Sequence, residues 1–192
     1  LANKGVRGQG NTVTYRDLTI TDGEVTVITP QGSLDRATDT LVATGGIQYY
    51  SARANLVAQK VTIRHREKRA IFEGDVRMLV KPKIEERKGP VIEPIPAFTP
   101  TPPEKVVAGK PSPVKEGDPL RSGKTIRDYP LVMVAAKMET VYAKGRRIAT
   151  ISGGSPQARQ ELGNGQWRQM WTYAARYDAE NEVLRLTSAP GR

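Results

Sequence analysis

The chain has 192 residues, with 30 Lys or Arg, 20 Asp or Glu, a formal net charge of +10, one histidine and no cysteine. The absence of cysteine excludes disulfide scaffolds, thiolate zinc sites and iron–sulfur clusters, and a single histidine excludes any two-histidine metal site. No apolar run approaches the roughly 20 residues of a membrane-spanning helix. The length predicts one domain, or one domain with a sizeable insertion, and the positive charge predicts an anionic partner.

Over the first 80 residues, apolar and polar residues alternate in short stretches. The alternating apolar residues are Val13/Tyr15, Val25/Val27, Ile47/Tyr49, Val61/Ile63 and then Phe72, Val76 and Met78. Between them, residues 21–23, 29–32 and 45–46 carry the Gly, Pro and Asp that are typical of turns. A period of two with one apolar face predicts half-buried antiparallel strands.

The next segment, 81–125, has a different composition. Ten of the fourteen prolines of the chain fall between Pro82 and Pro119, and proline removes the hydrogen-bond donors that a strand needs. This predicts a proline-rich extended loop inserted into one domain made of residues 1–80 and 126–192. Deletion of residues 84–123 is predicted to leave the fold intact. The alternative is a docking segment, in which residues 91–103 lie along a sheet edge or a partner groove.

After the insertion the alternation resumes. Val132, Val134, Ala136 and Met138 are assigned to one face of a strand, and Leu184 and Leu186 to one face of another. Within 167–177, one face takes Trp167, Trp171, Tyr173, Ala175 and Tyr177, and the other takes Arg168, Thr172 and Arg176. The glycine pair 153–154 is interpreted as a turn. The whole pattern predicts an all-β chain of about ten to twelve short strands.

Four segments share one form: a strand, a polar turn, and an alternating strand that ends in Gly. They are residues 33–46, 58–74, 135–153 and 174–191. The last copy, with Tyr177, Asp178, Leu184 and Leu186, resembles the OstA-like β-jellyroll of the lipopolysaccharide-transport (Lpt) proteins, as do the copies from Ala58 to Gly74 and from Ala136 to Gly153. The resemblance covers about 147 of the 192 positions, and the proline-rich insertion is not part of the family pattern.

This resemblance implies an open β-jellyroll, a taco-like sandwich, whose interior holds the acyl chains of a lipid. It implies a periplasmic, non-enzymatic bridge component. No cofactor and no metal are expected, and because the sequence starts at Leu1 and not at Met, a signal peptide or anchor is expected to have been removed. The implied partners are an anionic glycolipid such as lipopolysaccharide and other Lpt-type jellyrolls that join through β-edges, including head-to-tail copies of this chain. The branch stays open among the free bridge, the membrane-anchored member and the amino-terminal part of an outer-membrane protein.

Two sets of candidate residues follow from the alternation and the resemblance. The predicted lipid groove on the apolar inner face consists of Val13, Tyr15, Val25, Val27, Ile47, Tyr49, Val61, Ile63, Phe72, Val76, Met78, Val134, Met138, Trp171, Tyr173, Leu184 and Leu186. The predicted head-group contacts are Arg64, Arg66, Lys68, Arg69, Lys144, Arg146 and Arg147. The alternatives are an ordinary packed core for the first set and solvated hairpin turns for the second.

Two other functions remain as alternatives. One is a structural module that stacks edge to edge without lipid, and the other is a basic nucleic-acid-binding β-domain. Nucleic acid is not an expected partner, because single-strand platforms interleave aromatic residues with basic ones, whereas Tyr49 and Tyr50 are adjacent and face opposite ways. His65 is not expected to be a catalytic base, since no Gly-x-Ser-x-Gly elbow accompanies it.

Overall fold

The computed structural model of the chain describes residues 5–22, 25–83, 92–96, 128–163 and 166–188. These residues form twelve strands in one antiparallel sheet. The strands are β1 (Gly5–Gln9), β2 (Thr12–Asp22), β3 (Val25–Asp35), β4 (Thr40–Ser51), β5 (Ala54–Arg64), β6 (Arg69–Val80), β7 (Leu131–Ala143), β8 (Arg146–Ser152), β9 (Gln157–Gly163), β10 (Gln166–Trp171), β11 (Ala174–Asp178) and β12 (Val183–Thr187). The prediction of an all-β chain with ten to twelve strands is confirmed.

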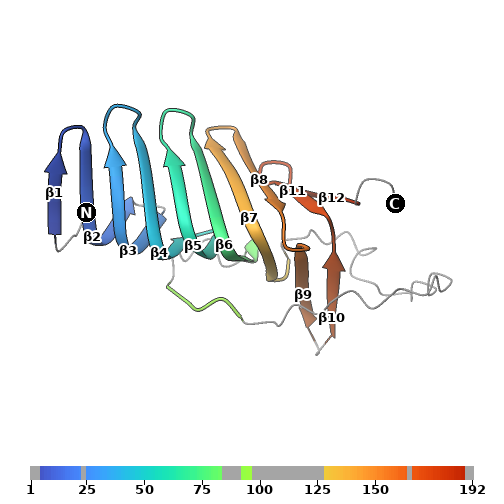
Figure 1. The fold of residues 1–192 in the computed structure, drawn as a ribbon. Coiled ribbons are helices and arrows are strands. Elements are labelled where there is room, and N and C mark those ends of the chain that lie inside the picture. Colours follow the sequence, from blue (N-terminus) through green and yellow to red (C-terminus); the bar gives the residue numbers. More distant parts are fainter. Residues whose placement is uncertain (1–4, 23–24, 84–91, 97–127, 164–165, 189–192) are drawn as a thin grey trace.

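The sheet is not closed. Strands β1 to β8 lie side by side in chain order, followed by β11 and β12 (Figure 1). Strand β9 pairs with the first residues of β7, and β10 pairs with β9. Within the described part of the chain, β1 pairs only with β2, and β12 only with β11. Strand β10 likewise pairs only with β9, so the described sheet has three edge strands and is open.

A line of irregularities crosses the middle of the sheet. The register shifts between residues 28 and 31, 44 and 47, 57 and 60, and 73 and 76, at successive strands. An extra residue in one strand bends it and increases its twist, and Gly45, Gly46 and Gly74 have positive φ angles of 86°, 106° and 77°. The line continues through residues 153–156, between β8 and β9, and 172–173, between β10 and β11. We call this line the crease.

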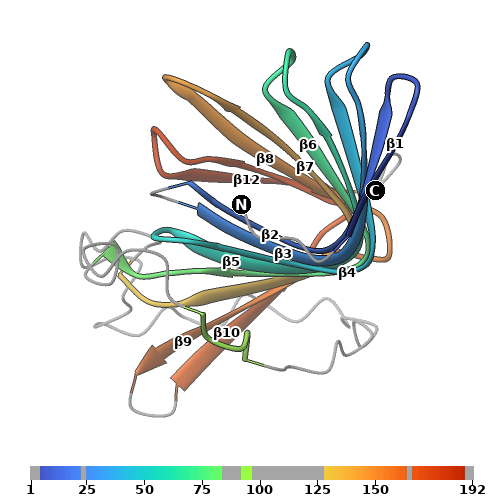
Figure 2. The ribbon, with the colours of Figure 1, turned by 90° about the vertical axis from the view of Figure 1, so that its left-hand side faces the viewer.

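The crease divides the sheet into two leaves. The upper leaf contains residues 5–16, 31–44, 60–73, 137–152 and 174–187, and the lower leaf contains 18–22, 25–29, 47–58, 76–80, 131–135, 157–163 and 166–171. Viewed along the row of strands in Figure 2, the leaves meet at the crease on the right and diverge toward the left. We call the open side the mouth. Residues 29–32, 45–46 and 153–154, interpreted as hairpin turns from the sequence, instead lie at the crease, and the strands are correspondingly longer than predicted.

The hairpin tips of the upper leaf form one rim of the mouth, and two of them, between β3 and β4 and between β11 and β12, have the same kind of turn. Asp35 accepts hydrogen bonds from the Ala37 amide at 2.8 Å and the Thr38 hydroxyl at 2.9 Å. Asp178 accepts hydrogen bonds from the Glu180 and Asn181 amides at 3.1 Å each. These turns coincide with the polar turns of the sequence repeat, so the repeat corresponds to stacked hairpins.

These two turns predict a loss of stability in acid. Hydrogen bonds from Thr38 and Ala37 hold the pKa of Asp35 below its ordinary value of 3.8, and those from Asn181 and then Glu180 do the same for Asp178. A carboxylate whose pKa is lowered by folding stabilises the protein fully above its unfolded pKa, and this contribution disappears as the pH falls through the folded pKa. Urea unfolding of wild type and Asp178→Asn from neutral pH to below pH 3.8 should show a smaller acid loss in the variant. Equal losses would contradict the role of Asp178.

The hydrophobic core lies between the two leaves. One continuous cluster takes buried residues from the inner face of both, among them Val61 and Met138 above and Leu56 and Met133 below. Phe72 in the upper leaf packs edge to face on Tyr49 in the lower leaf, with ring centroids 6.3 Å apart and planes at 71°. The leaves are therefore in side-chain contact across the space that separates their backbones.

A second, smaller cluster lies on the outer face of the lower leaf. Leu79 and Val132 are buried there, and Ile95 of the proline-rich insertion packs on them together with Val134. The buried Asn55 donates a hydrogen bond from Nδ2 to a backbone carbonyl of the insertion, that of residue 93, at 3.2 Å. Residues 92–96 thus cover part of the outer face of the sheet. Deletion of residues 84–123, which the sequence predicts to leave the fold intact, would remove this cover.

Candidate functional site

Most of the predicted groove residues lie in the cluster between the leaves. They are Val27, Ile47, Tyr49, Val61, Ile63, Phe72, Val76, Met78, Met138 and Leu184. Val13 is also buried, and Tyr15 and Val25 are half-buried, toward the amino-terminal end of the sheet. Leu186 is 46% exposed and borders a pocket at the other end. The structure therefore brings these residues to one face of the bent sheet.

Three predicted groove residues lie elsewhere. Val134 packs in the outer cluster with Leu79, whereas Met138 of the same strand lies in the interior. Trp171 and Tyr173 are 41% and 58% exposed. The sequence assigned these residues to the inner face by counting alternate positions, but the crease interrupts the count and reverses the two faces.

Trp167, paired with Trp171 in the sequence prediction, also lies outside the interior. It is 53% exposed, and the guanidinium carbon of Arg159 lies 4.8 Å from the centre of its ring, a cation–π contact. Its neighbours Arg168 and Met170 point the opposite way, since side chains alternate along β10. The aromatic residues of β10 therefore lie on the outer face of the lower leaf.

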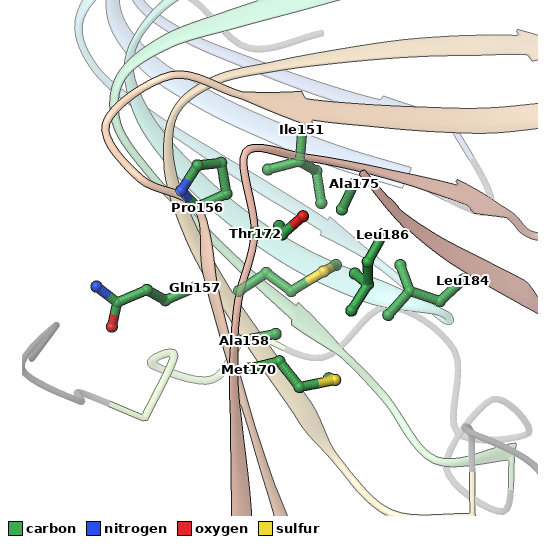
Figure 3. Close-up of a pocket in the computed structure, with 10 residues that line it drawn as sticks. Ile151, Pro156, Gln157, Ala158, Met170, Thr172, Ala175, Leu184 and Leu186 are labelled. Atoms are coloured by element: carbon green, nitrogen blue, oxygen red, sulfur yellow. The ribbon is translucent and has the colours of Figure 1, made fainter. Parts of the chain in front are cut away.

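The interior has an opening at the carboxy-terminal end of the sheet. The upper leaf contributes Ile151, Ala175, Leu184 and Leu186 to it, and the lower leaf contributes Met133, Ala158 and Met170, with Gln157 beside them. Pro156 and Thr172 line it from the crease (Figure 3). The cavity measures only about 10 Å³, which holds about one water molecule. The two leaves are closed on each other, and their own side chains fill the interior.

An ion pair joins the two sides of the mouth near this opening. Lys83 lies three residues after Val80, the last residue of β6 in the lower leaf, and its Nζ lies 2.8 Å from Oε1 of Glu182. Glu182 belongs to the hairpin tip between β11 and β12, in the upper leaf, where it has a positive φ angle of 55°. This contact links the lower leaf to the β11–β12 hairpin tip across the mouth.

The predicted head-group residues all lie at the hairpin tips, on the upper rim of the mouth. Four of them have partners in the protein: Arg64 with Glu67, Arg69 with Glu139, Arg147 with Glu180, and Arg66 with the Ala37 carbonyl. The Glu139 carboxylate, 2.8 Å away, raises the pKa of Arg69. Lys68, Lys144 and Arg146 are exposed and have no carboxylate within 4.0 Å among the described residues. These three are available to an outside anion.

One polar pair on the inner face was not predicted. Gln160 of β9 is fully buried, and Arg168 of β10 donates hydrogen bonds to its Oε1 from Nε at 2.9 Å and from Nη2. The strand register pairs Gln160 with Leu131, which is buried between the leaves, and pairs Arg168 with Gln160. The sequence assigned Trp167 and Trp171 to the inner face and therefore Arg168 to the solvent face. Arg168 shares its face with Met170, so assigning Met170 to the interior would have placed Arg168 there as well.

These features define a class: an open, creased β-jellyroll with an apolar interior between two leaves. Among solved structures the chain is similar to that of LptH, the LptA-homologous periplasmic component of the conserved lipopolysaccharide transport device of Pseudomonas aeruginosa. The TM-score is 0.52 at 13% sequence identity, and the match covers 87% of this chain and 84% of that chain. No protein-family model and no curated protein sequence matches. The match confirms the fold that the OstA-like resemblance implies. No helix among the described residues is long and apolar enough to cross a membrane.

Proposed function

We propose that this protein carries an anionic glycolipid such as lipopolysaccharide in the periplasm, as a non-enzymatic component of a transport bridge. The observation that carries the proposal is the position of the apolar residues. They line the inner faces of two leaves that share no strand pairing across the mouth within the described residues. Burial of acyl chains there would be favoured by about 25 cal/mol per Å² of apolar surface. The similarity of the fold to LptH supports the same function.

Binding requires the leaves to separate, because the cavity of about 10 Å³ is far smaller than the roughly 300–1,000 Å³ of ordinary ligand pockets. The crease is where such a motion would occur. Its bulges and positive-φ residues leave the hydrogen-bond ladder interrupted at successive strands. We propose that the leaves open at the crease, that acyl chains replace contacts such as Phe72 on Tyr49, and that the free cations Lys68, Lys144 and Arg146 contact the head group.

Locking the mouth tests this proposal. The chain has no cysteine, so Lys83→Cys with Glu182→Cys can be joined specifically by a short bismaleimide. We expect the cross-linked protein to bind purified lipopolysaccharide at least about tenfold more weakly than the same variant before cross-linking, a change of about 1.4 kcal/mol. The physical reason is that a closed mouth denies acyl chains access to the interior.

The matched control is Arg147→Cys with Glu180→Cys, cross-linked in the same way. These residues also form an ion pair, with Nε and Oε1 3.7 Å apart, but both belong to the upper leaf. Cross-linking them should leave lipopolysaccharide binding unchanged. Equal binding by the mouth-locked protein and its uncrosslinked form would show that lipid does not enter between the leaves.

The filled interior favours a second candidate, a structural module that stacks edge to edge without lipid. Strands β1 and β12 each have one side without a partner strand in the described residues, and an unpaired edge can accept a strand of another jellyroll. Other Lpt-type subunits, including head-to-tail copies of this chain, are the partners proposed for both functions. Lipid extraction and mass spectrometry of the purified protein separate the two candidates, because only the carrier retains glycolipid.

A further inference from the structure

Arg168 has an unusual position for a charged residue. Along the lower leaf, the inner face is built from apolar side chains, and Arg168 shares that face with Met170, Met133 and Leu131. Among the described strand residues of the lower leaf, it is the one cation on the inner face. It is half-buried, and no described carboxylate lies within 4.0 Å of it. Among the side chains that the structure describes, its guanidinium is hydrogen-bonded to a neutral amide oxygen, that of Gln160, and is not paired with a carboxylate.

Gln160 fixes the direction of that charge. The Gln160 side chain is fully buried, and its Nε2 donates to the Tyr129 carbonyl at 3.0 Å, which turns Oε1 toward Arg168. Arg168 donates to this single oxygen from Nε and Nη2. A guanidinium has five N–H donors, so three remain, on Nη1 and Nη2. One from each of these nitrogens points along the outer edge that binds a carboxylate or phosphate with two parallel bonds.

The site lies beside the opening of the interior. Met170, which lines the pocket in Figure 3, is two residues from Arg168 on the same face of β10, a separation of about 7 Å along a strand. The apolar pocket and the cation thus form adjacent parts of one surface. This arrangement is complementary to an amphiphile whose chain is apolar and whose end is an anion.

We propose that Arg168, oriented by Gln160, binds the phosphate or carboxylate of the lipid head group while an acyl chain occupies the adjacent pocket. This inference deepens the proposed carrier function and depends on it. It adds a contact on the lower leaf, opposite the basic hairpin tips of the upper leaf. The lipid is thus held by its charged end inside the mouth and not only at the outer rim.

Three probes test the site on the full chain: dodecyl phosphate, dodecanol and inorganic phosphate, each titrated by calorimetry. In wild type we expect dodecyl phosphate to bind about tenfold or more tightly than dodecanol, since hydrogen bonds to charged groups have effects of this size. In Arg168→Met the two affinities should agree within about threefold, with dodecanol unaffected. Arg168→Lys retains the charge without the planar edge, so its ratio of dodecyl phosphate affinity to dodecanol affinity should lie between the ratios of wild type and Arg168→Met. This variant provides the test if Arg168→Met does not fold.

Arg185→Met is the matched control. Arg185 is exposed on β12, next to the pocket residues Leu184 and Leu186 but on the opposite face, so this variant should keep the wild-type ratio. Equal binding of dodecyl phosphate and dodecanol by wild type, or an unchanged ratio in Arg168→Met, would overturn the anion site and leave the carrier function standing. If inorganic phosphate binds as tightly as dodecyl phosphate, the anion that Arg168 binds is free phosphate and not the head group of a lipid. Binding of neither amphiphile would overturn the carrier function itself.

Discussion

Replacing Phe72 by alanine should lower the free energy of unfolding by about 3–5 kcal/mol, the usual cost of removing a buried aromatic side chain. Phe72 is buried in the upper leaf and contacts Tyr49 of the lower leaf edge to face. The substitution therefore removes apolar burial, leaves a cavity and breaks a contact between the leaves. Urea denaturation followed by circular dichroism measures the change as a lower midpoint.

Val183→Ala provides the control for this prediction. Val183 lies on β12 and is 41% exposed, so its truncation should change stability by no more than about 0.5 kcal/mol. A loss below about 1 kcal/mol for Phe72→Ala would contradict the conclusion that the two leaves form one core, since it would fall far under the range for a filled interior.

Substitution of Gly74 by alanine should destabilise the protein by about 2–5 kcal/mol, from two separate causes. Gly74 has a φ angle of 77° at the crease, and the left-handed region costs a residue with a Cβ about 1–2 kcal/mol. A Cβ at this position would also lie 2.9 Å from Cβ of Gln59 and 2.8 Å from its Oε1, and overpacking typically costs about 1–3 kcal/mol. The measurement is the urea midpoint at constant slope.

Gly145→Ala separates these two causes. Gly145 has a similar φ angle of 72°, in the hairpin between β7 and β8, but a Cβ there would meet nothing within 4 Å. Its substitution should cost only the backbone component, about 1–2 kcal/mol. Equal losses at Gly74 and Gly145 would show that close packing against Gln59 does not define the crease.

The sequence was sufficient to predict the strands and the composition of the interior. The alternation of Val61 with Ile63, or of Met78 with Val76, was correct because each pair lies within one uninterrupted half-strand. The repeat located the hairpin tips, because Asp35 and Asp178 precede turns whose hydrogen bonds are local. The proline-rich segment, which the composition predicts to be an insertion, lies between Val80, where β6 ends, and Leu131, where β7 begins.

The crease limited what the sequence could show. Gly45–Gly46 and Gly153–Gly154 were interpreted as hairpin turns, since glycine serves turns and bulges alike. An alternation counted across a bulge reverses, which is why Val134 and Trp171 were assigned to the inner face and Arg168 to the outer one. A glycine signal gives no information on whether the chain reverses or only bends.

The sequence by itself determined that this protein is an all-β chain whose strands have one apolar face, because side-chain alternation and turn chemistry are local properties of the chain. The tertiary structure decided which residues face inward beyond each bulge, that the leaves close on each other, and that Lys83 meets Glu182 across the mouth. It also placed Arg168 beside the pocket. These features depend on strand register and on contacts between residues far apart in the chain, which the order of residues does not display.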